Sequence, residues 1–176
     1  VQAIVLSERP EREDTVETTT LFEAEPLQVV VPYREVTGDV SREKIGIAYK
    51  FEYTGTDIIF DEFLLKVLLE SWFTDVNPAY QSWRDEGIIS RAFTTDVALK
   101  EGIGVLYFID EGINLEAFVQ FVDTVLKNST VDDALIEQLK RRYYGEMVFG
   151  LSQMEQTAVN IAQYHLDDSN YFDMLK

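Results

Sequence analysis

Between Asp57 and Phe73 the chain carries a nearly continuous apolar stretch, and this stretch constrains the fold most strongly. Eleven of its seventeen residues are apolar, so the apolar surface of a helix built from it extends well beyond one face. Because each such side chain contributes about 1.5–3 kcal/mol when it leaves water, we expect a helix buried on more than one side. Charged residues interrupt the run, and a membrane span needs about 20 mostly apolar residues, so the sequence argues against a transmembrane helix.

The whole sequence of 176 residues is strongly acidic, with 32 acidic against 15 basic residues and a formal net charge of −17. A field of that sign repels phosphate backbones and anionic membrane surfaces, so we expect neither nucleic acid nor a membrane as a partner. A solvated acidic surface that aids solubility is the simplest interpretation, and a basic partner or a cationic substrate is the alternative.

The sequence contains no cysteine and a single histidine. The absence of cysteine excludes disulfides, thiolate zinc sites and thiol nucleophiles, and it leaves the redox compartment open. We expect a cytoplasmic protein. Because Val1 is not an initiator methionine and no secretory signal follows it, we also expect the chain to be an excised piece of a longer protein.

The first part of the chain predicts a lead-in followed by strands. Residues 1–26 mix a short apolar run with charged and threonine-rich stretches, which is typical of a linker or an extended lead-in. Residues 27–176 are expected to form one domain. Its first predicted strand is the β-branched run 27–36, at a sheet edge because Pro32 interrupts it. The alternating segment Lys44–Tyr53 is the second.

Helix and turn signals organise the remainder of the chain. Thr56 or Asp57 is a candidate N-cap for the apolar helix, and Gly87 is suited to end a short helix over about 79–86. A hairpin is predicted next, with strands at about 88–99 and 102–109. Three helices follow, from the N-cap Asn114 to about 126, at about 131–149 and at about 152–165. A capping box from Ser152 to Glu155 opens the last of them. Because the helices are gathered rather than alternating with single strands, we expect an α+β two-layer domain. Its mainly antiparallel sheet of about four strands is covered on one face by helices.

Four short segments stand out by their order and spacing. They are Glu25-Pro26 with the following strand residues 45–50 (IGIAYK), the helix 64–73 (LLKVLLESWF), the segment 80–89 (YQSWRDEGII), and Lys140-Arg141-Arg142 with Gly145 and the helix around Glu155. Together they resemble the non-catalytic, C-terminal-type half of a bacterial member of the insulinase/pitrilysin family of zinc peptidases, over roughly residues 25–174. The resemblance implies the α+β fold shared with LuxS and mitochondrial processing peptidase, in which two similar halves close around a peptide.

The resemblance also implies where zinc lies. In the family the metal is held in the amino-terminal half, on an H-x-x-E-H helix with a distant Glu. This chain lacks that motif, since its one histidine, His165, is followed by Leu-Asp-Asp-Ser. We therefore predict no metal ligand and no catalytic residue here, with zinc in the partner half and His165 at a surface or helix end. Asp132-Asp133 and Asp167-Asp168 are predicted to be helix caps and solvated charge.

Two substrate-binding positions follow from the resemblance. Members of the family often place an Arg and a Tyr, from an L-R-x-x-x-x-L-x-Y region, beside the substrate, where they hydrogen-bond the scissile carbonyl as it becomes an oxyanion. Arg84 matches the Arg, and the Tyr position falls at about Ser90, where this chain departs from the pattern. The alternative for Arg84 is an exposed helix-end arginine paired with Asp85 or Glu86.

Three functions are consistent with these inferences. The first is the zinc-free half of an insulinase-type peptidase. It forms a wall of the chamber that encloses the substrate, helps to bind an extended peptide and hydrolyses nothing alone. Its partner is the zinc-bearing half or a homologous subunit, with a homodimer as one arrangement. The second is a family member without peptidase activity that serves as a scaffold or assembly subunit, which the departure at Ser90 favours. The third is an unrelated α+β binding module that uses its acidic surface for a cationic partner.

Overall fold

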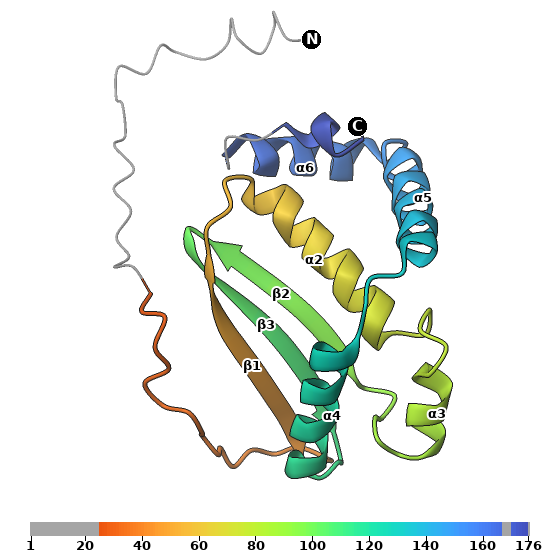
Figure 1. Cartoon of the computed structure of the whole chain (residues 1–176). Coiled ribbons are helices and arrows are strands. Elements are labelled where there is room, and N and C mark those ends of the chain that lie inside the picture. Colours follow the sequence, from red (N-terminus) through yellow and green to blue (C-terminus); the bar gives the residue numbers. More distant parts are fainter. Residues whose placement is uncertain (1–24, 167–169, 176) are drawn as a thin grey trace, which may run out of the picture.

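The computed structural model describes residues 25–166 and 170–175, and in this part of the chain a three-stranded antiparallel sheet lies beside a set of helices (Figure 1). The strands are β1 (Lys44–Tyr53), β2 (Thr94–Lys100) and β3 (Gly102–Glu111), in the order β1-β3-β2. The helices are α2 (Ile58–Phe73), α3 (Tyr80–Asp85), α4 (Leu115–Asn128), α5 (Asp133–Gly150), α6 (Met154–Leu166) and a 3₁₀ turn, η1 (Tyr171–Leu175). The predicted α+β class with an antiparallel sheet is confirmed.

Strand β1 has the bounds and the alternation that the sequence predicts. Its inward residues, which pack against the core, are Ile45, Ile47, Tyr49, Phe51 and Tyr53. Gly104 of β3 lies directly opposite Phe51 in the ladder. A Cβ at Gly104 would lie 2.2 Å from the Phe51 ring, so only glycine leaves room for this ring across the sheet.

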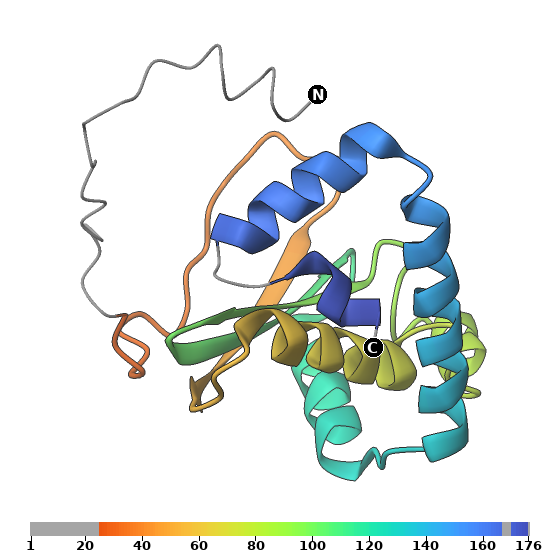
Figure 2. The same ribbon diagram turned by 90° about the horizontal axis from the view of Figure 1, so that it is seen from above.

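The core lies between the sheet and the helices α2 and α4, which cover the same face (Figure 2). Phe73 of α2, Phe108 of β3 and Phe118 of α4 are fully buried there. Phenolic hydrogen bonds connect β1 to both helices: Tyr53 donates to Asp61 of α2 (2.6 Å) and Tyr49 to Asp123 of α4 (2.7 Å). Helices therefore cover one face of the sheet, as predicted.

Helix α2 is buried on two sides, as its apolar composition predicts. The Asp57 carboxylate caps it by accepting from the Phe60 N–H at 3.0 Å. Beyond the sheet side, Glu70 accepts from Tyr143 of α5 (2.5 Å) and from Arg142 Nη2 (2.7 Å). Burial, followed by the hydrogen bond to Glu70, raises the pKa of Tyr143 to about 12. Within residues 25–166 and 170–175, no helix combines the length and the apolarity of a membrane span.

The predicted edge strand at residues 27–36 is wrong. This segment has no regular structure and its side chains are exposed, with Val30 at 81% of its full accessibility. Pro32 removes one backbone donor within the run and Pro26 directly precedes it, so pairing along the run is weakened. The described sheet accordingly has three strands rather than about four. Residues 1–24 of the predicted lead-in and residues 167–169 lie outside the described residues.

The predicted strand at 88–99 begins later than expected, at Thr94. The reason is that backbone donors in residues 88–92 bind nearby groups instead of a ladder: the Ser90 N–H donates to the Asp110 carboxylate and the Ala92 N–H to the Ser90 hydroxyl. The hairpin turn at Gly102 is confirmed, with φ of 80°.

Two of the three N-caps predicted for the later helices are confirmed. Asn114 caps α4 through Ala117, and Asp132 caps α5 through Ala134 and Leu135. The capping box predicted at Ser152 is wrong, because its hydroxyl donates back to the Phe149 carbonyl at 2.7 Å and α6 begins at Met154.

Candidate functional site

Helix α3 ends in a turn that directs the residues after it. The Gly87 N–H donates to the Arg84 carbonyl (3.1 Å) and the Ile88 N–H to the Trp83 carbonyl (2.8 Å), which is the Schellman arrangement. Gly87 has φ of 71°, a left-handed conformation that favours glycine, so its predicted role is confirmed. Residues of the segment 83–90 then line two separate cavities.

The first cavity brings Arg84 and Ser90 together in an open pocket of about 920 Å³. We call it the arginine pocket; it is lined by Arg42, Arg84, Asp85, Ile89, Ser90, Arg91 and Glu111. These residues come from the chain before β1, from the last turn of α3 and the connection that follows it, and from the end of β3. The two positions that the sequence marked for substrate binding therefore face one space, and their binding of substrate stays a prediction.

Ser90 is held in place by a buried carboxylate. The Asp110 side chain, 1% exposed, accepts hydrogen bonds from the Ser90 N–H (2.9 Å), the Ser90 hydroxyl and the Glu111 N–H (2.7 Å). The Ser90 hydroxyl in turn accepts from the Ala92 N–H at 2.9 Å. Because its one proton is directed to Asp110, this hydroxyl fixes the turn and has no second proton to donate to a ligand.

Arg84 carries a guanidinium without an ion pair among the described residues. The predicted alternative of a pair with Asp85 or Glu86 is not formed, since the Asp85 carboxylate instead accepts from Gln81 Nε2 at 2.7 Å. Arg84 is half-buried in the last turn of α3. Its five N–H donors are therefore available to a group that enters the pocket.

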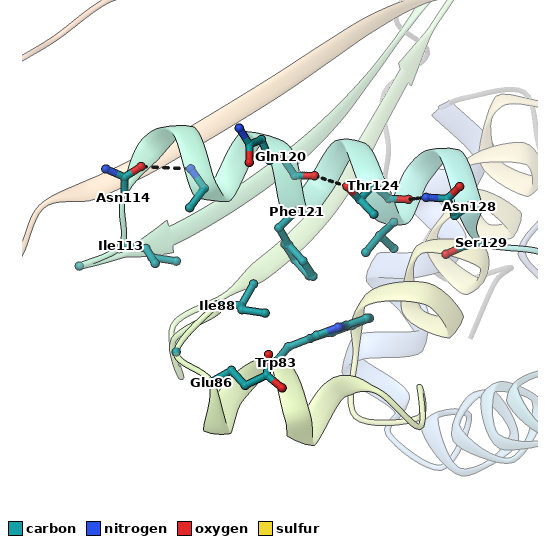
Figure 3. A pocket seen from close by; sticks show the side chains of 14 residues that line it. Trp83, Glu86, Ile88, Ile113, Asn114, Gln120, Phe121, Thr124, Asn128 and Ser129 are labelled. Atoms are coloured by element: carbon teal, nitrogen blue, oxygen red, sulfur yellow. Dashed lines mark hydrogen bonds between the residues drawn. The ribbon is translucent and has the colours of Figure 1, made fainter.

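The second cavity, of about 830 Å³, lies between α3 and α4 (Figure 3). We call it the tryptophan groove; it is lined by Trp83, Glu86, Gly87, Ile88, Gly112, Ile113, Asn114, Ala117, Gln120, Phe121, Thr124, Val125, Asn128 and Ser129. The rings of Trp83 and Phe121 meet edge to face at 5.0 Å between centroids. Polar side chains of α4, among them Gln120 and Thr124, line the groove beside this apolar floor.

The chain's own residues do not fit a zinc site. The sequence contains one imidazole and no thiol, whereas a hydrolytic zinc takes three protein ligands such as two histidines and a glutamate. His165 is exposed in the last turn of α6. Among residues 25–166 and 170–175, no group of three or more His, Asp or Glu side chains is placed to hold a metal ion.

The sequence analysis missed Arg42, Arg91 and Glu111 of the arginine pocket, and also Asp110, which holds Ser90 from behind. In the sequence, Asp110 simply follows the predicted strand at about 102–109. Only its hydrogen bonds with Ser90 in the structure show that it holds the turn. Arg42 lies before β1 and Arg91 follows Ser90, so neither belongs to a recognisable motif. The register of β1 with β3, which pairs Lys44 with Glu111, brings the chain before β1 to the end of β3, and this long-range pairing is not encoded locally.

Comparison with known proteins supports the fold. No protein-family model matches the chain, and no curated protein sequence matches it. Among solved structures, the chain is similar to a "putative M16-like peptidase" from Alicyclobacillus acidocaldarius, with a TM-score of 0.54 and 18% sequence identity. The similarity covers 64% of this chain and 28% of that chain, so this chain corresponds to less than a third of that protein's length. The shared fold is of the kind that the sequence resemblance implied.

Proposed function

We propose that this chain is the zinc-free half of an insulinase-type metallopeptidase, where it walls the chamber and helps to bind an extended peptide. One observation carries the proposal: the Arg84 guanidinium, without an ion pair among the described residues, lines the arginine pocket beside Ser90. The similarity of the fold to that of an M16-like peptidase supports it. The domain at 27–176 and a cytoplasmic location are parts of the same proposal.

In this proposal Arg84 acts on the scissile peptide bond. A guanidinium stays protonated and presents its donors in a planar fork. When such donors point at the carbonyl oxygen of a peptide, they stabilise the negative charge that develops on it during attack by water. Because Arg84 forms no ion pair with a described carboxylate, its N–H donors are available for that interaction.

Zinc belongs to the other half in this proposal, whether that half lies in the same polypeptide or in a homologous subunit. When bound there, zinc would supply Lewis-acid chemistry and an activated water. The residues of this chain bind and orient the peptide and close the chamber around it. This division of labour predicts that the 176-residue chain alone hydrolyses no peptide.

The test compares the isolated chain with the chain assembled with its H-x-x-E-H half. We expect peptide hydrolysis, abolished by a chelator, in the assembly alone. Arg84→Ala lowers kcat of the assembly about 10²- to 10³-fold, the usual cost of one oxyanion donor. Arg141→Ala, an exposed arginine on α5, is the matched control and leaves kcat unchanged. Chelator-sensitive hydrolysis by the isolated chain would refute the proposal.

The geometry of Ser90 favours a second candidate, a scaffold or assembly subunit without peptidase activity. The resemblance places the family's tyrosine at about Ser90, and the Ser90 proton is directed to Asp110 rather than into the pocket. In this case the assembled protein would hydrolyse no peptide even with zinc supplied, while removal of this chain would disperse the other subunits. Size-exclusion chromatography with and without this chain, together with the hydrolysis assay, separates the two candidates.

A further inference from the structure

Three guanidinium groups from separate segments line the arginine pocket. Arg84 comes from α3, Arg91 follows Ser90, and Arg42 precedes β1. Backbone and side-chain hydrogen bonds position the segments that carry Arg42 and Arg91. The Gly112 N–H donates to the Glu43 carbonyl at 2.9 Å, next to Arg42, and the Asp110 carboxylate holds the turn that carries Arg91.

These arginines differ from most other cations of the described chain in lacking carboxylate partners. Outside the pocket, six basic side chains form ion pairs; they are Lys50, Lys66, Lys127, Lys140, Arg141 and Arg142. Within the described residues, none of the three arginines in the pocket forms one, although Asp85 and Glu111 line the same space. Three arginines and two carboxylates line the pocket, with the buried Asp110 carboxylate behind Ser90, in a chain whose formal net charge is −17.

We propose that the arginine pocket binds a carboxylate of the peptide and so selects acidic peptides, with Arg42 and Arg91 as the specificity-determining residues. The inference rests on the proposed peptide-binding function. Arg84 donates to the backbone carbonyl, while the planar forks of Arg42 and Arg91 match the two oxygens of a carboxylate. That carboxylate belongs either to an acidic side chain or to the free C-terminus of the peptide.

The overall negative charge of the chain opposes the binding of an acidic peptide. At long range a chain of −17 repels an acidic peptide and attracts a basic one. A preference for acidic peptides therefore requires a local cluster of cations that outweighs the general field at contact distance. The same field disfavours nucleic acid, whose many phosphates extend well beyond one pocket.

The experiment measures binding of three peptides of equal length to the 176-residue chain by calorimetry. One is neutral, with glutamines and an amidated C-terminus; one carries a central glutamate; and one carries a free C-terminal carboxylate. We expect one of the two acidic peptides to bind about tenfold more tightly than the neutral one, and which of them does so identifies the source of the carboxylate. Arg42→Gln with Arg91→Gln removes the preference and retains binding of the neutral peptide.

A double variant with the same change of charge serves as the matched control. Lys140→Gln with Arg141→Gln alters exposed residues of α5 that lie outside the pocket, and it retains the preference. Equal binding of all three peptides by the unaltered chain would overturn the inference and leave the proposed function standing. Loss of the preference in the control, or tighter binding of an RNA oligonucleotide through Arg42 and Arg91, would also overturn it. Binding of none of the peptides would contradict both the inference and the proposed function.

Discussion

The arginine pocket and the tryptophan groove share the segment 83–90, yet the groove has an aromatic floor and the pocket presents arginines. The floor of the groove belongs to the core: Phe121 is 9% exposed and its ring contacts those of Phe73, Trp83 and Phe93. The pocket presents arginines that form no ion pair with a described carboxylate. Substitutions in the groove should therefore change stability, whereas substitutions of the arginines should change ligand binding alone.

The largest effect is expected at the floor of the groove. Phe121→Ala removes a ring from a cluster of aromatic side chains and leaves a cavity, so the free energy of unfolding falls by about 3–5 kcal/mol. Urea denaturation measures it. A loss below about 1 kcal/mol would show that the groove is lined by adaptable side chains and would remove the contrast between the two regions.

The anchor beneath the arginine pocket comes next. Asp110→Ala leaves the half-buried donors of Ser90 and Glu111 without their buried acceptor, so the free energy of unfolding falls by about 2–3 kcal/mol. Ser90→Ala removes one of the three donors to Asp110, the Ser90 hydroxyl, so it should lower the free energy of unfolding by less. Urea denaturation of both variants checks this order, and a larger loss in Ser90→Ala would contradict the assignment of Asp110 as the anchor.

A smaller effect is expected at the turn between the two cavities. Gly87→Ala forces a side chain into the left-handed conformation at φ of 71°, at a cost of about 1–2 kcal/mol. Gly145→Ala is the matched control, because nothing lies within 4 Å of its added Cβ in the middle of α5. That substitution should stabilise the chain by about 0.5–1 kcal/mol. The same sign for both substitutions in thermal unfolding would contradict the role given to the turn.

The smallest change in stability is expected at the arginines themselves. Arg42→Gln, Arg84→Ala and Arg91→Gln remove side chains that form no ion pair in the described part of the chain, so each should alter the free energy of unfolding by less than about 0.5 kcal/mol. Chemical denaturation checks each variant. A loss above 1 kcal/mol would show that the arginines support the fold, and the contrast with the groove would fail.

The elements of the fold were predictable where local pattern decides them. The alternation of β1, the apolar run of α2 and the caps Asn114 and Asp132 are properties of short segments, and the structure confirms them. The strand predicted for the β-branched run at 27–36 is wrong. Its residues favour a strand, but no strand of the described chain pairs with it. The strand predicted to begin at residue 88 begins only at Thr94. One reason is that the buried Asp110 carboxylate accepts the Ser90 N–H that a strand ladder would use.

The candidate site was predictable only in part. Resemblance to a family singled out Arg84 and Ser90, and the structure places both on one pocket. Arg42 joins them through the pairing of β1 with the distant β3, and Asp110 through a contact across twenty residues. Such contacts depend on tertiary packing, so no local pattern could reveal them.

The most direct test of the central claim follows the Arg84 side chain by NMR. In the chain labelled with ¹⁵N-arginine, the Nε–H resonance of each arginine is recorded during titration with an extended peptide. The account predicts that the Arg84 resonance shifts in proportion to the bound fraction while that of Arg141 on α5 stays in place. Saturable binding of the peptide with an unmoved Arg84 resonance would contradict the account.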